Sequence, residues 1–328
     1  MLREEIIKLP KVELHCHLDG SLSQGFVEKR LGRPVRREEL SVSNDCTSLA
    51  EYLEKFDLPG QCLRDEEGLE EAGYDVLRSM KQENVIYSEI RFAPLLSETE
   101  DMSCSKVIEA VLRGLERGKK DFGIDFGLIV CAMRHHSEEM NWRMIRTARE
   151  YLGSGVCAAD LAGAEASYPM SEFKNLFQNT HKLGMPFTIH AGECGSAQNI
   201  IDSVEAGAGR IGHGIAMRGH SDLIKELAGK GIGIEMCPIS NLQTKAVAGL
   251  EEYPIREFLN GGLKVTVNTD NRTVIDTTMT KELEFIQKTY GIRDDEIYLL
   301  MKNAVDVAFT EEHVKDRLHR IMKEAYGA

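Results

Sequence analysis

Short apolar runs alternate with longer amphipathic stretches along almost the entire chain. Eight of these runs are short enough to be strands: Val12–His17, Val85–Ala93, Asp125–Met133, Val156–Gly163, Pro186–Glu193, Arg210–Gly214, Gly231–Ser240 and Lys264–Asp270. The stretches between them repeat apolar residues at helical spacing, as in Lys106–Phe122, Met144–Leu152 and Ser171–Leu183. Strands that alternate with helices predict parallel βαβ units, and eight such units predict an α/β fold, a closed (β/α)8 TIM barrel.

The interval between the first two runs is anomalously long, at about 65 residues, and exceeds what one crossover helix needs. In a barrel, a helical insertion after strand one lies over the C-terminal face, where active sites form. Within it, Leu49, Tyr52, Leu53 and Phe56 recur at helical spacing. This segment is either an ordinary core-facing helix or an apolar lid that places Leu53 and Phe56 over a substrate.

Length and composition favour one large globular unit. The chain has 328 residues, and neither a linker nor a low-complexity segment divides it, so we expect a single barrel domain over residues 1–328. Residues Thr278–Ala328, rich in Glu, Lys, Leu and Met, predict extra C-terminal helices. A hydrophobic content of 42% suits a sizeable core, and a net charge of −13 argues against a nucleic-acid partner.

The compartment is indicated by the N-terminus and the cysteines. The first ten residues carry acids where a secretory signal would be apolar, and no run approaches the roughly 18 apolar residues of a membrane span. Eight cysteines are scattered without a CxxC pair or the spacing of a small disulfide scaffold. We expect a cytoplasmic protein with reduced thiols and no membrane partner, and these patterns leave its oligomeric state open.

Side chains suited to metal binding or proton transfer stand at the ends of four predicted strands. His15 and His17 end the first run, and because residues i and i+2 of a strand share a face, both imidazoles project together. Three later runs end in His190-Ala-Gly-Glu193, Gly212-His213-Gly214 and Asn268-Thr269-Asp270. One such residue is more often structural than functional, but the C-termini of barrel strands meet at one mouth, so the set predicts a shared site.

The ligand types narrow the metal. Three histidines and one carboxylate, with a position left open for water, suit Zn²⁺ best, although Fe²⁺, Mn²⁺ and Co²⁺ accept the same ligands. Glu193 and one unligated histidine would remain for general acid and general base chemistry.

Six motifs, taken in order, resemble the adenosine deaminases of the amidohydrolase superfamily. They are His15-Cys-His-Leu-Asp-Gly20, Asp160-Leu-Ala-Gly163, His190-Ala-Gly-Glu193, Gly212-His-Gly214, Cys237-Pro-Ile-Ser-Asn241 and Asn268-Thr-Asp270, each at a predicted strand end. The resemblance extends over nearly the whole chain. It implies hydrolysis of adenosine, and of 2′-deoxyadenosine, to inosine or deoxyinosine and ammonia, with one Zn²⁺ per chain.

The resemblance also implies roles for individual residues. Glu193 would protonate purine N1, and His213 would be the base or the electrostatic partner of the attacking water. Glu235 and Ser240 would orient that water or His213. The zinc ligands would be His15, His17, His190 and Asp270.

The purine nucleoside would contact a second set of residues. Asp19 would face a ribose hydroxyl, and the backbone N–H of Gly163 would face purine N3. Many family members have an aspartate where this chain has Asn271, at the position that faces purine N7. Because N7 is an acceptor, an amide that always carries N–H donors solves the same contact without needing a proton.

Three alternatives remain at this stage. The first keeps the chemistry but changes the substrate to adenine or a 5′-modified adenosine. Relatives that act on the free base tend to have His-Leu-Glu-Gly where this chain has His17-Leu-Asp-Gly20, and the shorter acid favours a nucleoside. The second is a non-catalytic barrel that only binds, which would normally lack a ligand or the acid. The third is an amidohydrolase that cleaves an ester or an amide.

Overall fold

Eight parallel strands form the centre of the computed structural model, which describes residues 1–43, 52, 54–194 and 196–327. The strands are β1 (Lys11–His17), β2 (Val85–Phe92), β3 (Asp125–Met133), β4 (Val156–Ala162), β5 (Thr188–Ala191), β6 (Arg210–His213), β7 (Gly233–Met236) and β8 (Lys264–Val267). They pair in chain order as β1-β2-β3-β4 and β5-β6-β7-β8.

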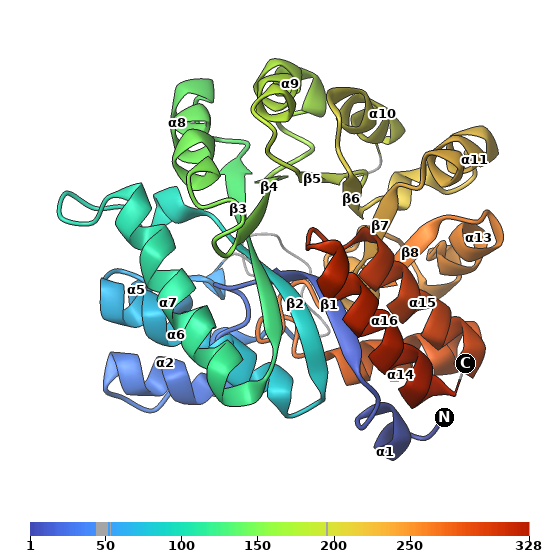
Figure 1. The fold of residues 1–328 in the computed structure, drawn as a ribbon, viewed down its shortest axis with the longest axis horizontal. Coiled ribbons are helices and arrows are strands. Elements are labelled where there is room, and N and C mark those ends of the chain that lie inside the picture. The colour runs from blue at the N-terminus through green and yellow to red at the C-terminus, as the bar shows by residue number, and fades with distance from the viewer. Residues whose placement is uncertain (44–51, 53, 195, 328) are drawn as a thin grey trace.

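Two seams close these sheets into a barrel. Between β4 and β5, the Ala159 N–H donates to the Pro186 carbonyl at 2.9 Å. Between β8 and β1, the Asp270 N–H donates to the His15 carbonyl at 2.8 Å, and the His17 N–H donates to the Asp270 carbonyl at 2.7 Å. The predicted (β/α)8 barrel is confirmed, and in Figure 1 its helices surround the strands.

The helices that follow the strands cover the outside of the barrel. In chain order the helices are α1 (Arg3–Ile6), α2 (Gln24–Leu31), α3 (Arg37–Leu40), α5 (Asp57–Cys62), α6 (Glu66–Lys81), α7 (Cys104–Phe122), α8 (Glu138–Arg149), α9 (Lys174–Lys182), α10 (Ala197–Ala206), α11 (Ser221–Lys230), α12 (Pro238–Gln243), α13 (Ile255–Asn260), α14 (Met279–Tyr290), α15 (Asp294–Val307) and α16 (Glu312–Tyr326). Short 3-10 turns are η1 (Pro94–Leu96), η2 (Met170–Glu172), η3 (Ile215–Met217) and η4 (Leu250–Glu252). The last three α-helices are the C-terminal helices expected from the sequence.

Two predicted boundaries are wrong for local reasons. The predicted strand 231–240 ends at Met236, because Pro238 occupies the first turn of α12, where its fixed φ and missing N–H suit a helix start. The predicted helix 144–152 instead begins at Glu138, since the Ser137 side chain accepts the Met140 N–H and caps it.

The insertion after β1 contains α2, α3, α5 and α6. Helices α6 and α7 pack closely because Gly114 has no side chain: a Cβ there would lie 1.9 Å from the Glu70 carbonyl oxygen. Half of the predicted helix 49–56 falls outside the described residues, Leu53 included. Tyr52 and Phe56 are described, with ring centroids 5.7 Å apart, and both pack on buried apolar residues that include Ile275, after β8.

We propose that the chain forms one domain, because a continuous cluster of buried apolar side chains extends from Ile6 in α1 to Met322 in α16. Within the described residues, no helix has the length and apolar character needed to cross a membrane.

Phe177 of α9 tests how much this packing stabilises the barrel. Its ring is fully buried, and its centroid lies 5.0 Å from that of Phe187, the residue directly before β5. We expect Phe177→Ala to lower the free energy of unfolding by about 3–5 kcal/mol, measured by denaturant titration. Ile321→Ala, at a partly exposed aliphatic side chain of α16, is the control and should cost less than about 1 kcal/mol. Equal costs for both variants would contradict the packing described here.

Candidate active site

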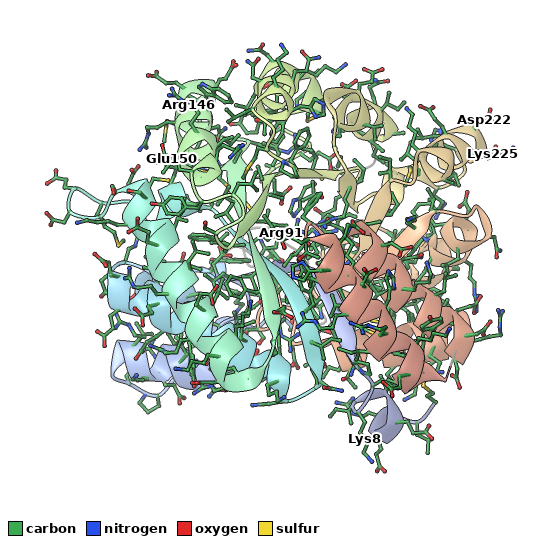
Figure 2. The ribbon with its side chains drawn as sticks, in the orientation of Figure 1. Lys8, Arg91, Arg146, Glu150, Asp222 and Lys225 are labelled. Carbon is green, nitrogen blue, oxygen red and sulfur yellow. The ribbon has the colours of Figure 1, made fainter. Side chains whose placement is uncertain are left out.

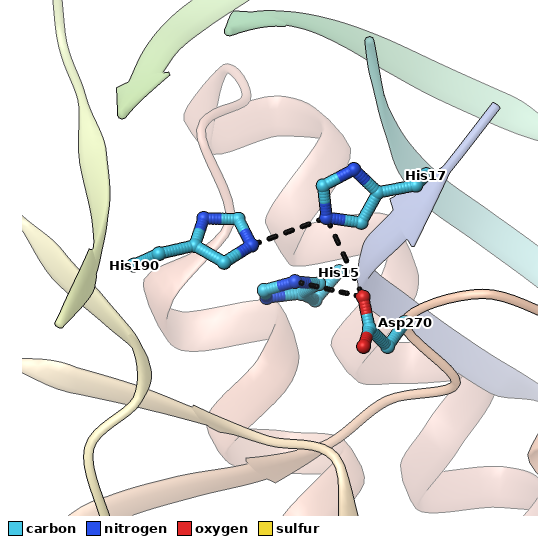
Figure 3. A group of neighbouring side chains, drawn as sticks. All are labelled: His15, His17, His190 and Asp270. Atoms are coloured by element: carbon cyan, nitrogen blue, oxygen red, sulfur yellow. Dashed lines mark hydrogen bonds and ion pairs between the residues drawn. The ribbon is translucent and has the colours of Figure 1, made fainter. Parts of the chain in front are cut away.

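The four predicted metal ligands come together at the C-terminal ends of the strands (Figure 3). His17 Nε2 lies 3.1 Å from His190 Nε2, and Asp270 Oδ1 lies 3.5 Å from His15 Nε2 and 3.4 Å from His17 Nε2. One ligand atom from each residue lies within 4.8 Å of all the others. Residues up to 255 positions apart in the sequence therefore present their donor atoms to one point.

The chemistry of this cluster fits a cation. His15 Nε2 is buried and makes no hydrogen bond within the part of the chain that the structure describes, while its Nδ1 lies 2.8 Å from Glu235. A buried ring nitrogen without a partner is costly unless it has a ligand to bind. Burial lowers the pKa of His15 to about 4, so its imidazole is neutral at pH 7, as metal coordination requires. Three imidazoles and one carboxylate fit a zinc site with an open position.

Strand register and backbone conformation bring these groups together. His190 of β5 pairs with Gly212 of β6, and a Cβ at Gly212 would lie 3.2 Å from the His15 ring, so glycine leaves room for the imidazole. His213 and Asp270 have φ values of 64° and 61°, a left-handed conformation uncommon outside glycine. Such backbone is retained where the surrounding structure imposes it, often at functional sites.

Two buried carboxylates orient His15 and His190 by contacting Nδ1 of each ring, the nitrogen that does not face the cluster. Asp160 Oδ2 lies 2.8 Å from His190 Nδ1, and Glu235 Oε2 takes the same position on His15. Arg91 joins them, with donor distances of 2.9 Å to Asp160 and 2.8 Å to Glu235, and lies at the centre of the barrel (Figure 2). Burial alone would raise the pKa of Asp160, but His190 and Arg91 hold that pKa below its ordinary value. Both carboxylates therefore stay ionised and direct the Nε2 atoms into the site.

The two groups predicted to orient the water or His213 have other partners. Glu235 contacts His15, and Ser240 Oγ donates to Asp270 Oδ2 at 2.6 Å, so each supports a predicted metal ligand. His213 is contacted instead by Asn241 of α12, whose Nδ2 lies 3.0 Å from His213 Nδ1. Since an amide nitrogen only donates, this contact favours a His213 ring that accepts at Nδ1 and carries a proton on Nε2.

Asp160 begins the motif Asp160-Leu-Ala-Gly163, and sequence reasoning assigned it no role. Its contact with His190 supplies a test. We expect Asp160→Asn to weaken zinc affinity about 10- to 100-fold, because the amide lacks the charge that orients and polarises His190. Competition with a chromophoric chelator measures this affinity. Asp75→Asn is the matched control: Asp75 is also a buried carboxylate, but it accepts from Ser23 on the insertion. Equal zinc affinity in Asp160→Asn and wild type would refute the role.

The predicted acid lies beside the predicted base. Glu193 Oε2 is 3.7 Å from His213 Nε2, and Thr244 Oγ1 donates to Glu193 Oε1 at 3.5 Å. The Glu193 side chain is 26% exposed, whereas His213 is buried. Because Glu193 follows the predicted ligand His190 by three residues, the acid and one metal ligand come from the end of β5 and the residues directly after it.

The residues predicted to bind substrate surround this centre with unused polar atoms. Asp19 Oδ1 and Asn271 Oδ1 are both buried without a hydrogen-bond partner among the described residues, and burial raises the pKa of Asp19 to about 6. Asn271 Nδ2 donates to the Tyr52 hydroxyl at 3.1 Å, a contact that sequence reasoning missed. Gly163 follows β4 with φ of 104°, which favours glycine. A Cβ at Gly20 would lie 1.9 Å from Asn271 Oδ1, so glycine is required there too.

Comparison with known proteins agrees with this geometry. Residues 10–325 match the family described as "Adenosine deaminase". An adenosine deaminase from Enterococcus faecalis is 38% identical over 99% of this chain and 99% of its own length, and one from Streptococcus agalactiae is 39% identical over 100% and 99%. A solved amidohydrolase from Burkholderia ambifaria with bound zinc is similar with a TM-score of 0.88 and 22% identity, covering 99% of this chain and 92% of that one. The N6-methyl-AMP deaminase of Arabidopsis thaliana has a TM-score of 0.86 at 25% identity, with 99% of each chain covered.

The family match covers nearly the entire chain. The sequence identity of the full-length relatives is high enough to show a shared family and not only a shared fold. The chain belongs to the adenosine deaminase family.

Proposed function

We propose that this chain catalyses the hydrolytic deamination of adenosine to inosine and ammonia, and that it accepts 2′-deoxyadenosine. The observation that carries the proposal is the meeting of His15, His17, His190 and Asp270 beside the pair formed by Glu193 and His213. The full-length relatives are named adenosine deaminases, which supports adenosine as the substrate.

The metal we propose is one Zn²⁺ per chain, held by His15, His17, His190 and Asp270. The bound zinc of the Burkholderia ambifaria neighbour supports this choice. When bound, zinc acts as a Lewis acid and lowers the pKa of a coordinated water toward neutrality. The chain itself prepares the ligands for coordination. Glu235 contacts His15 and Asp160 contacts His190, and these contacts keep the two imidazoles in the state and orientation that coordination requires.

Glu193 supplies the proton that the purine needs. C6 of adenosine is a poor electrophile until N1 is protonated, so a carboxylic acid beside N1 is required. Transfer of this proton to N1 accompanies addition of the water oxygen to C6, and N1 keeps the proton in inosine. Of the two protons of the water, one goes to the amino group, which leaves as ammonia, and the other restores the carboxylic acid of Glu193. General acid catalysis of this kind contributes about 10²–10⁴-fold.

His213 lies beside the Glu193 carboxyl, with its Nε2 nearest Glu193 Oε2. The contact with Asn241 favours a proton on Nε2, the nitrogen nearest Glu193. This N–H can donate to the oxygen that attacks C6 and hold it in place, which favours a positioning and electrostatic role over general base catalysis for a ring protonated on Nε2.

Asp19, Gly163 and Asn271 select the nucleoside. The free Oδ1 of Asp19 suits a ribose hydroxyl, and the N–H of Gly163 suits purine N3. Asn271 donates to N7, while Phe56 covers the base as part of a lid. Polar contacts of this kind discriminate between substrates. A substrate that lacks the matching group leaves a buried polar group of the site without a hydrogen bond.

Asn271→Leu tests the contact with N7. We expect wild-type protein to prefer adenosine over 7-deazaadenosine, which has C–H in place of N7, by about 10-fold or more in kcat/KM. Asn271→Leu should lose most of this preference, since leucine cannot donate. Spectrophotometric rates for both substrates with both proteins form the test, and a preference that persists in Asn271→Leu would exclude the contact.

The seven described cysteines are all free thiols, which supports our proposal that the protein works in the reducing cytoplasm. Its proposed partner is the small-molecule nucleoside.

The proposed activity is tested with a panel of substrates. Zinc-loaded protein is incubated with adenosine, 2′-deoxyadenosine, adenine, AMP and cytidine, and the ultraviolet spectrum is followed. We expect the two nucleosides of adenine to be converted, cytidine to be inert, and adenine and AMP to react far more slowly. Conversion of adenine or AMP alone would reassign the substrate, and an inert panel with zinc bound would refute the deaminase proposal.

A further inference from the structure

Glu165 lies in the loop after β4, and its carboxylate binds the segment that carries the acid. Glu165 is buried, with only 4% of the residue exposed to solvent. Oε1 accepts the Gly192 N–H at 2.7 Å, while Oε2 accepts the Glu193 N–H at 3.0 Å and the Cys194 N–H at 3.2 Å. One carboxylate therefore binds three consecutive backbone donors, and the middle one belongs to the residue that we propose protonates N1.

A fourth donor fixes the carboxylate itself. Asn199 of α10 donates Nδ2 to Glu165 Oε1 at 2.7 Å, and its Oδ1 accepts the Met170 N–H at 3.0 Å. The Asn199 amide is thus held at both ends and in a defined orientation. Glu165 is connected through it to the start of α10, which follows the segment that Glu165 binds.

The turn that Glu165 holds has little freedom. Gly192 has φ of 75°, and a Cβ there would lie 2.4 Å from the Ile200 side chain. Its carbonyl accepts the Ala216 N–H at 2.9 Å. The backbone on one side of Glu193 is therefore set by packing and hydrogen bonding, while its side chain is only lightly held, by Thr244 at 3.5 Å. The position of the carboxyl depends chiefly on the backbone from which it extends.

We propose that Glu165 is a positioning residue for deamination: it holds the backbone of residues 192–194 so that the Glu193 carboxyl lies where N1 of the substrate binds. This inference rests on the proposed function. A buried carboxylate is costly unless several donors satisfy it, and here all four donors belong to the segment after β5 or to the helix that follows it. The placement explains why a carboxyl group is buried behind the acid, where its hydrogen bonds among the described residues go to the backbone of residues 192–194 and to Asn199.

The test is a double-mutant cycle between Glu165 and Glu193. Glu165→Gln presents an amide N–H₂ to N–H donors, so the carboxylate's contacts cannot all form. We expect it to lower kcat for adenosine by roughly 10- to 100-fold, with little change in KM, because the acid is misplaced. In the Glu193→Gln background, measured at high enzyme concentration, the same change should alter kcat by less than about threefold, since no acid remains to misplace.

A conservative exchange and zinc analysis separate positioning from general damage. In Glu165→Gln/Asn199→Asp the donor and acceptor of that pair are exchanged, so part of the lost kcat should return. Zinc content per chain should equal that of wild type in every variant, because the His190 side chain is not touched. If Glu165→Gln does not fold, Asn199→Ala, which removes one of the four donors, replaces it in the cycle with the same expectations.

The outcomes distinguish a positioning role of Glu165 from a general structural role. A loss of kcat by the same factor with and without Glu193, or a loss that follows zinc content, would overturn the positioning role. Wild-type protein is measured in the same series: if it does not deaminate adenosine, the proposed function fails, whereas an active wild type with an additive cycle refutes only the inference about Glu165.

Discussion

Glu193→Gln is expected to lower kcat for adenosine by about 10²–10⁴-fold. Glutamine has the same size and can keep the contact with Thr244, but its amide cannot give N1 a proton. Purified zinc-loaded variant and wild type are compared by the change in adenosine absorbance, together with thermal unfolding and zinc content. Both of these should match wild type, because Glu193 is partly exposed and is not among the clustered ligands.

The control for this prediction is Glu205→Gln, at an exposed glutamate near the end of α10, outside the proposed site. It makes the same chemical change and should retain wild-type kcat. If Glu193→Gln kept roughly a third or more of the wild-type kcat, Glu193 would not be the general acid.

His17→Ala is expected to cost both the metal and the activity. It removes one of four converging donors, and an incomplete set of ligands no longer matches the tetrahedral preference of zinc. We expect zinc content to fall well below one ion per chain and kcat to fall at least about 10³-fold, since Lewis-acid activation of water accounts for several kcal/mol. Elemental analysis after gel filtration and the adenosine assay measure the two effects.

His313→Ala provides the matched control, because His313 is a 75% exposed histidine on α16. It should keep full zinc content and full activity. If His17→Ala bound zinc as tightly as wild type, the proposed ligand set would be wrong, whatever its activity.

The barrel and the metal cluster could be predicted because each depends on a local pattern. A short apolar run identifies a strand such as Val12–His17, and parallel barrel topology then places the C-terminal ends of all such strands at one mouth. His15, His17 and His190 lie in or at the ends of β1 and β5, and Asp270 follows β8 by three residues, so the topology places all four at one mouth.

The supporting residues could not be predicted in the same way. Arg91 and Glu165 act on groups that lie far away in the sequence, and in Glu165 most of those groups are backbone N–H donors, which every residue has. No residue pattern marks such a partner. Glu235 was singled out, but its partner was missed, because the choice between His15 and His213 depends on rotamers and on the exact register of β6 and β7.

The lid remains a prediction. Tyr52 links its segment to Asn271, and Phe56 packs with Tyr52 beside the loop after β8, while Leu53 lies outside the described residues. Sequence periodicity identified the apolar face but not the hydroxyl contact, since tyrosine counts as apolar in such a pattern.

The most direct test of the central claim is the fate of oxygen and nitrogen when adenosine is incubated with zinc-loaded protein in ¹⁸O-labelled water. Mass spectrometry of the nucleoside product and an ammonia assay are run on the same sample. We predict inosine with one heavy oxygen at C6 and ammonia in equal amount, with neither product formed above background by Glu193→Gln over the same interval. Inosine without the label, or adenosine left intact by protein that holds its zinc, would contradict hydrolytic deamination at this site.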